Sequence, residues 1–121
     1  MNQSQNPKQY DLEERCLMFS KTTRLFISKL PKSIANIEDG KQLIRSSGSI
    51  GANYIEANES LSKKDFLFRI KISRKEAKET RYWLSLIDTK NLPNLEKERM
   101  KLLQESIELM KIFSAIMRKS E

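Results

Sequence analysis

The side chains in this chain that could do chemistry are lysines and arginines, and they gather between Ser62 and Leu92. This segment holds nine Lys or Arg residues against four Asp or Glu, so it supplies five of the seven net positive charges. On a helix turning about 100° per residue, six of these cations fall on one side. They are Lys64, Lys71, Arg74, Lys75, Lys78 and Arg81.

A one-sided group of cations favours an anionic partner. Lysine and arginine neutralise phosphates and release the counterions condensed on them, which gives affinity for RNA or DNA of any sequence. The alternative is a solvated helix face that only maintains solubility. Tyr82 lies beside Lys75 and Lys78, so a further alternative is that its ring stacks on an RNA base.

The composition lacks the residues that most often form catalytic and metal-binding sites. The chain has no histidine and one cysteine, which removes the usual general base and any structural zinc site. The acidic candidates are two couples spaced three residues apart, Glu56/Glu59 and Glu76/Glu79. A magnesium site is one interpretation of them. We favour another, in which Glu76 and Glu79 pair with Arg45, Arg69 or Arg81. We predict no enzyme activity, no cofactor and no metal.

Cys16 and the hydropathy pattern bear on the compartment. Cys16 lies on the apolar side of the first predicted helix, so we interpret it as a core residue. A single cysteine forms no internal disulfide, which fits a reducing compartment. Apolar runs are too short to span a membrane, and the polar start resembles no signal peptide. We therefore predict a soluble, cytoplasmic protein without membrane contact.

The elements that must position the cations are long helices. Only three glycines and three prolines occur in 121 residues, and apolar residues recur at steps of three and four. Asp11 and Ser62 are the predicted N-caps of the first and third helices. The prediction is all-α: an up-and-down antiparallel four-helix bundle with helices at about 11–31, 36–59, 63–89 and 94–118. It forms one domain over residues 10–121, after a flexible tail at residues 1–9.

The second predicted helix contains glycines, which cost about 1 kcal/mol each in a helix interior relative to alanine. Close contact with another helix offsets such a cost. The predicted close-packing face consists of Ser47, Gly48, Gly51 and Ala52. A phosphate-binding loop is the competing interpretation, and it fails because the GxxxxGK[ST] pattern and a preceding strand are both missing.

The third predicted helix has a wider apolar arc than a single core contact needs. Beyond the inward residues, the arc continues over Phe68, Ile72, Trp83 and Leu86. One explanation is a wider core within the same chain. The other is an interface with a second copy of the protein, which makes these four residues the candidate oligomer interface.

Three segments together resemble a known family. They are RSSGSIGANYIEAN at 45–58, SKKDF at 62–66 and EAKETRYWL at 76–84. They resemble the bacterial four helix bundle protein family, also called the ribosomal RNA intervening-sequence protein family, over Tyr10 to about Met117. That resemblance implies a bundle that assembles into a ring, a pentamer. The family is similar to the accessory variability determinant of diversity-generating retroelements, which implies nucleic acid and a reverse transcriptase as further partners.

The favoured hypothesis is a non-enzymatic homo-oligomeric bundle that binds RNA or DNA through the basic surface of its third helix. The phosphate-binding residues would be the six cations named above, which position the ligand without reading bases. The alternative is an oligomeric scaffold for a protein partner, with no nucleic-acid ligand.

Overall fold

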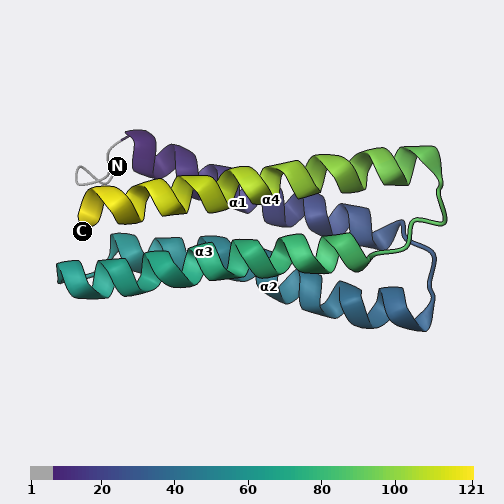
Figure 1. Ribbon diagram of the computed structural model, residues 1–121, viewed down its shortest axis with the longest axis horizontal. Coiled ribbons are helices and arrows are strands. Elements are labelled where there is room, and N and C mark those ends of the chain that lie inside the picture. Colours follow the sequence, from purple (N-terminus) through teal and green to yellow (C-terminus); the bar gives the residue numbers. More distant parts are fainter. Residues whose placement is uncertain (1–6) are drawn as a thin grey trace.

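The fold consists of four helices that run alternately up and down. A computed structural model describes residues 7–121. It contains α1 (Pro7–Ser28), α2 (Ile34–Asn58), α3 (Lys63–Leu86) and α4 (Pro93–Ser120). Figure 1 shows each helix returning antiparallel to the one before it. The predicted all-α up-and-down four-helix bundle is confirmed over this range.

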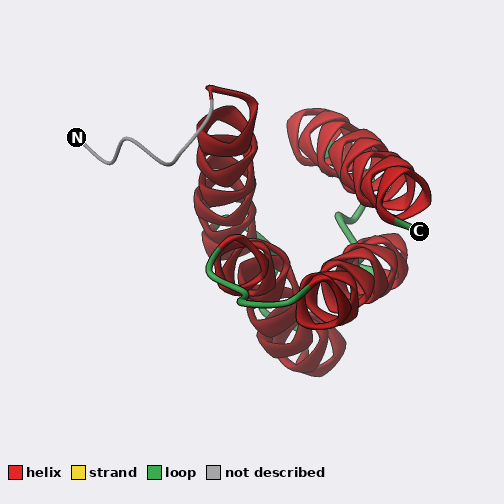
Figure 2. Cartoon of the chain, turned by 90° about the vertical axis from the view of Figure 1, so that its left-hand side faces the viewer, coloured by secondary structure: helices red, strands yellow, loops and turns green. Residues whose placement is uncertain are grey.

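The helices pack unevenly around the bundle. α2 packs against α3, and α3 against α4, along most of their lengths, whereas α1 packs mainly on α2 and touches α4 much less. Seen along the bundle in Figure 2, the wider spacing lies between α1 and α4. α3 therefore lies between two well-packed neighbours, and its orientation is set by both of them.

The first helix begins earlier and ends earlier than the sequence predicted. It starts at Pro7, so Asp11 lies inside the helix and its predicted role as N-cap is wrong. Proline suits a first helical turn, where its missing N–H would have no partner anyway. The helix ends at Ser28, not at residue 31, because the next residues turn more tightly: the Leu30 amide donates to the Ile27 carbonyl at 3.1 Å. Of the predicted tail, residues 1–6 lie outside the described residues, and residues 7–9 belong to α1.

The other boundaries follow from caps and from the loops. Ser33 caps α2 by accepting the Asn36 amide at 3.1 Å, so α2 starts at Ile34, two residues before its predicted start. Ser62 caps α3 as predicted, accepting the Asp65 amide at 3.1 Å. α3 ends at Leu86, not at residue 89, because Ile87 turns the chain into an extended conformation.

The apolar stripes of all four helices meet in one core. Its fully buried members include Phe26, Leu43, Ile50, Ile70, Leu84, Leu109 and Phe113. The rings of Tyr54 and Phe113 meet edge to face, with centroids 5.6 Å apart. Cys16 is buried in the same core, as predicted, and burial raises the pKa of its thiol to about 12.

A buried asparagine ties the two loops at one end of the bundle together. The Asn36 side-chain amide donates to the carbonyl of Pro31 at 3.0 Å and to that of Asp88 at 2.8 Å. Its carbonyl oxygen accepts the Asp88 amide at 3.0 Å. One side chain thus satisfies backbone groups of both the α1–α2 and the α3–α4 connections.

The two central glycines of α2 differ in the room around them. A Cβ atom on Gly51 would lie 3.0 Å from the Cβ of Cys16, so Gly51 lets α1 and α2 approach closely. A Cβ atom on Gly48 would lie 3.8 Å from the nearest atom, the Ser20 hydroxyl, which is an ordinary contact. Of the other two residues of the predicted close-packing face, Ser47 is buried, whereas Ala52 is exposed, so its inclusion in that face was wrong.

This difference predicts opposite effects of one substitution at the two sites. Gly48→Ala should raise the free energy of unfolding by about 1 kcal/mol, because alanine is the better helix former and has room. Gly51→Ala should lower it by about 1–2 kcal/mol, because overpacking against the Cys16 Cβ outweighs that gain. Urea unfolding followed by circular dichroism measures both. A Gly51→Ala protein as stable as Gly48→Ala would contradict the close α1–α2 contact.

The loop contact gives a second prediction. Asn36→Ala removes three hydrogen bonds made by a buried side chain and leaves backbone groups of Pro31 and Asp88 without these partners, so it should destabilise the protein by about 2–4 kcal/mol. Asn94→Ala, at an exposed position in the first turn of α4, is the control and should change stability by less than about 0.5 kcal/mol. Equal effects of the two substitutions in thermal unfolding would refute the role of Asn36.

Candidate nucleic-acid interface

Buried hydroxyl groups fix the orientation of α3 about its own axis. The Ser73 hydroxyl donates to the carbonyl of Ile50 on α2 at 2.9 Å. The Thr80 hydroxyl lies 2.9 Å from the hydroxyl of Ser46, also on α2. All three hydroxyl side chains are buried. Because these contacts pin the inner face of α3 to α2, they determine which side chains of α3 point outward.

The six predicted phosphate-binding residues all lie on the outward side of α3. Each of Lys64, Lys71, Arg74, Lys75, Lys78 and Arg81 is exposed. At a rise of 1.5 Å per residue, they extend over roughly 26 Å of the helix. We call these six residues the α3 basic surface. The structure brings together the whole set that the sequence predicted.

Most of these cations have no acidic partner. Lys75 lies 3.9 Å from a carboxylate oxygen of Glu79, one turn along the helix. The other five form no ion pair with any carboxylate of the described residues. Their charges are therefore not compensated by the part of the chain that the structure describes, and they remain available to an anion from outside.

The acidic side chains of α3 lie on its other flank, toward α2. Arg45 of α2 approaches Glu76 at 3.7 Å and Glu79 at 3.3 Å, which confirms the predicted ion pair for this arginine. Arg69 instead donates to the Asn53 side chain at 3.0 Å. Among the described residues, no three acidic or sulfur side chains gather closely enough to hold a metal ion.

The predicted oligomer interface divides into two pairs of residues. Ile72 and Trp83 are half-buried, and Trp83 packs against the core, which fits a wider core within the chain. Phe68 and Leu86 are 59% and 47% exposed, so about half of each side chain faces solvent. The Arg69 guanidinium lies 5.9 Å from the centroid of the Phe68 ring. Both sequence-based explanations therefore have residues that fit them. The Trp83 indole N–H is buried without a hydrogen-bond partner among residues of the described chain.

Tyr82 lies at the border between the basic surface and this apolar flank. Its side chain is 59% exposed. Its ring meets that of Trp83 nearly at a right angle, with centroids 5.2 Å apart. In an edge-to-face pair of this kind, the neighbour covers at most one face of a ring. At least one face of the Tyr82 ring is therefore free of Trp83.

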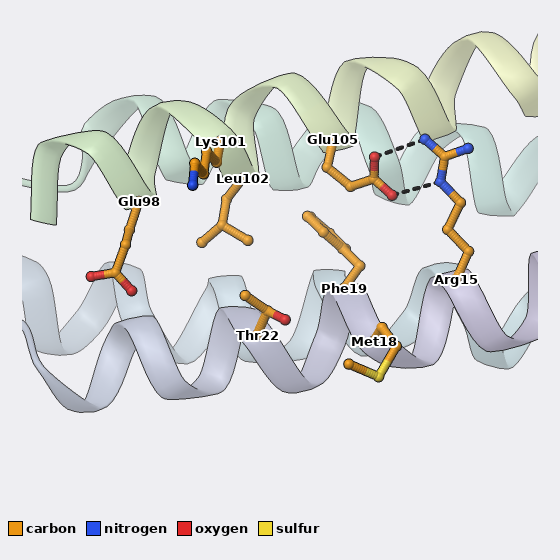
Figure 3. A pocket seen from close by; sticks show the side chains of 8 residues that line it. All are labelled: Arg15, Met18, Phe19, Thr22, Glu98, Lys101, Leu102 and Glu105. Carbon is orange, nitrogen blue, oxygen red and sulfur yellow. Dashed lines mark hydrogen bonds and ion pairs between the residues drawn. The ribbon is translucent and has the colours of Figure 1, made fainter. Parts of the chain in front are cut away.

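One further feature, a groove between α1 and α4, was not predicted from the sequence. Figure 3 shows it, with Met18 and Phe19 on one wall and Leu102 on the other. Its volume is about 270 Å³. At one end, Arg15 donates to both carboxylate oxygens of Glu105, at 2.7 and 2.8 Å (Figure 3). Apolar periodicity identifies the inward face of each helix but not which pair of helices packs least closely, so no sequence signal could have located it.

The groove is a weaker candidate site than the basic surface. Both carboxylates that line it are already paired, since Arg15 pairs with Glu105 and Lys29 pairs with Glu98. The two buried side-chain atoms left without a hydrogen-bond partner in the described chain, on Glu76 and Trp83, both belong to α3. A specific small-molecule site needs polar groups that converge on a ligand, and here they converge on one another.

No helix within residues 7–121 has the length and apolar character needed to cross a membrane. The charged face of α3 is the surface whose chemistry most clearly calls for a partner. Its exposed cations and the exposed ring beside them form the candidate interface.

Comparison with known proteins finds a matching family and similar solved structures. The sequence profile described as "23S rRNA-intervening sequence protein" matches residues 8–115. A crystal structure of a protein of unknown function from the S23 ribosomal protein family of Bacteroides thetaiotaomicron is similar, with a TM-score of 0.74 and 29% sequence identity. The similarity covers 92% of this chain and 98% of that one. No functionally curated protein matches. The profile match spans most of the chain, so the protein belongs to the 23S rRNA-intervening sequence protein family.

Proposed function

We propose that this protein is a non-enzymatic homo-oligomer that binds RNA or DNA in the cytoplasm through the α3 basic surface. The observation that carries the proposal is the set of five exposed cations on one side of α3 without an acidic partner in the described chain. Phosphates are anions spaced regularly along a chain, and a row of cations on a straight helix suits such a ligand.

The kind of contact follows from the residue types. Lysine and arginine at exposed helix positions bind phosphates and fix the position of a strand, but they carry no information about sequence. Binding should therefore tolerate many sequences and weaken steeply as salt increases.

Self-association is the second part of the proposal. Phe68 and Leu86 expose apolar side chains on the flank of α3 that adjoins the basic surface. A second copy that covers them would remove this apolar area from water. Repeating the basic surface in a ring such as a pentamer would raise the apparent affinity for a strand long enough to contact several copies.

A protein scaffold is the second candidate function. The same exposed residues, Phe68 and Leu86, could receive a different protein, such as a reverse transcriptase, in place of another copy. Nucleic-acid binding and self-association are measured separately, so each part of the proposal has its own experiment.

The first experiment reverses charge on the basic surface. In the Lys71→Glu/Arg74→Glu/Lys75→Glu/Lys78→Glu protein, binding to a labelled single-stranded RNA should be lost while the helical circular dichroism spectrum is kept. If four phosphates are neutralised, the wild-type slope of log affinity against log salt should be about −2.8. Affinity would then fall roughly 50-fold between 50 and 200 mM salt. Fluorescence anisotropy across a salt series measures the slope.

The matched control reverses four exposed lysines elsewhere: Lys21→Glu/Lys32→Glu/Lys41→Glu/Lys97→Glu. Both variants change the net charge of +7 to −1, since each replacement of a cation by glutamate removes two charges. The control should lose much less affinity than the α3 variant and keep most of the salt slope. Equal losses would show that only net charge matters, and that α3 is not the binding surface.

The second experiment tests self-association. Light scattering coupled to size exclusion should show an oligomer for the wild type and a folded monomer for Phe68→Glu/Leu86→Glu, because charged side chains oppose burial at an interface. Leu25→Glu/Ile34→Glu, at exposed positions of α1 and α2, is the control and should leave the mass unchanged. A monomeric wild type, or an unchanged mass for the α3 variant, would refute this interface.

A further inference from the structure

Tyr82 is an exposed aromatic ring in a cationic setting. It follows Lys78 by four residues and Lys75 by seven, spacings that place all three on one side of the helix. All three side chains are exposed. Burial of an aromatic ring is strongly favourable, yet 59% of the Tyr82 side chain is exposed to solvent in the described chain.

The contact with Trp83 holds the ring in place for a partner. The nearly perpendicular packing, at 5.2 Å between ring centroids, restricts the Tyr82 side chain while leaving at least one face free of Trp83, and the side chain remains 59% exposed. A ring that is already ordered loses little conformational freedom on binding. The position therefore has the properties of a preformed stacking platform.

The chemistry beside the ring identifies the kind of partner. Lys78 has no acidic partner in the described chain, so it is free to bind a phosphate. It lies one helical turn from Tyr82, a rise of about 6 Å. This is close to the length of two nucleotide steps at 3.4 Å each along a stacked strand. Every nucleotide of a strand supplies both an anion and a flat aromatic group at such a spacing, whereas an acidic residue of a peptide supplies the anion alone.

We infer that Tyr82 stacks on an unpaired base of a bound strand, so that the ligand class of the α3 basic surface is single-stranded nucleic acid. In a duplex the bases already stack on each other and their faces are covered, so the ring would have nothing to bind. Stacking on aromatic side chains together with cations along the backbone is a general way of binding single strands without sequence preference. This inference rests on the proposed function, because it adds a base contact to the same phosphate-binding surface.

The test separates phosphates from bases. The probes are a 12-nucleotide oligouridylate, an abasic 12-mer carrying the same number of phosphates, and a 12-base-pair duplex. The wild type should bind the oligouridylate roughly 5- to 150-fold more tightly than the abasic strand, the range expected for one stacked base. Tyr82→Ser should abolish that difference while leaving abasic binding unchanged. Tyr82→Phe, which keeps the ring, should restore it.

Trp83 offers a second signal at the same place. It is the only tryptophan of the chain and lies against Tyr82, so its fluorescence should change when a base stacks there. Oligouridylate should alter the emission more than the abasic strand at equal saturation. Leu25→Ser, which changes an exposed side chain on α1, is the control and should behave as the wild type in both measurements.

The outcomes distinguish the inference from the proposal on which it rests. Equal affinity for oligouridylate and abasic strand, or an unchanged preference in Tyr82→Ser, would overturn stacking but leave phosphate binding in place. Binding to none of the three probes at 20 mM salt would overturn both and point to an acidic protein as the partner. Tighter binding to the duplex than to the oligouridylate would overturn the assignment to single strands.

Discussion

The rotation of α3 about its own axis determines what this protein can present to a partner. Two buried hydroxyl contacts to α2, from Ser73 to the Ile50 carbonyl and between Thr80 and Ser46, fix that rotation. Hydrogen bonds are directional, so they permit less variation than apolar packing alone. If α3 were rotated about its axis by one residue position, lysines would point toward the core. The arrangement of cations outside therefore depends on small polar side chains inside.

α3 consequently has three sides with different properties. The inner side packs in the core, the basic surface faces solvent, and the third side carries Phe68, Leu86 and the ion pairs to Arg45. The basic and apolar sides adjoin along the helix at Lys75 and Tyr82. If copies associate through Phe68 and Leu86, a bound strand would lie next to the junction between subunits. Such an arrangement would let one strand follow several copies without a long gap between them.

The sequence predicts α3 well because its signals are local. Apolar residues that recur every three or four positions identify its buried face, and Ser62 identifies its start. The outward position of the cations follows from both. The errors in the predicted helix ends arise where tertiary contacts determine the boundary. α3 ends before its predicted limit, in a loop where Asp88 is bound by Asn36, a residue 52 positions away. In α1, residues before Asp11 join the helix because proline is tolerated in a first turn.

The free face of Tyr82 depends on the side-chain position of Trp83, which no residue spacing specifies.

The uneven packing around the bundle has a consequence for its motions. α1 is attached mainly through α2, and its side toward α4 borders an open groove (Figure 3). Regions with fewer buried contacts open at lower free energy than the rest of a protein. Amide hydrogens of α1 should therefore exchange with solvent through partial unfolding, while those of α3, packed on both sides, exchange only when the whole bundle unfolds. The helix that carries the binding surface would then belong to the most persistent cooperative unit of the fold.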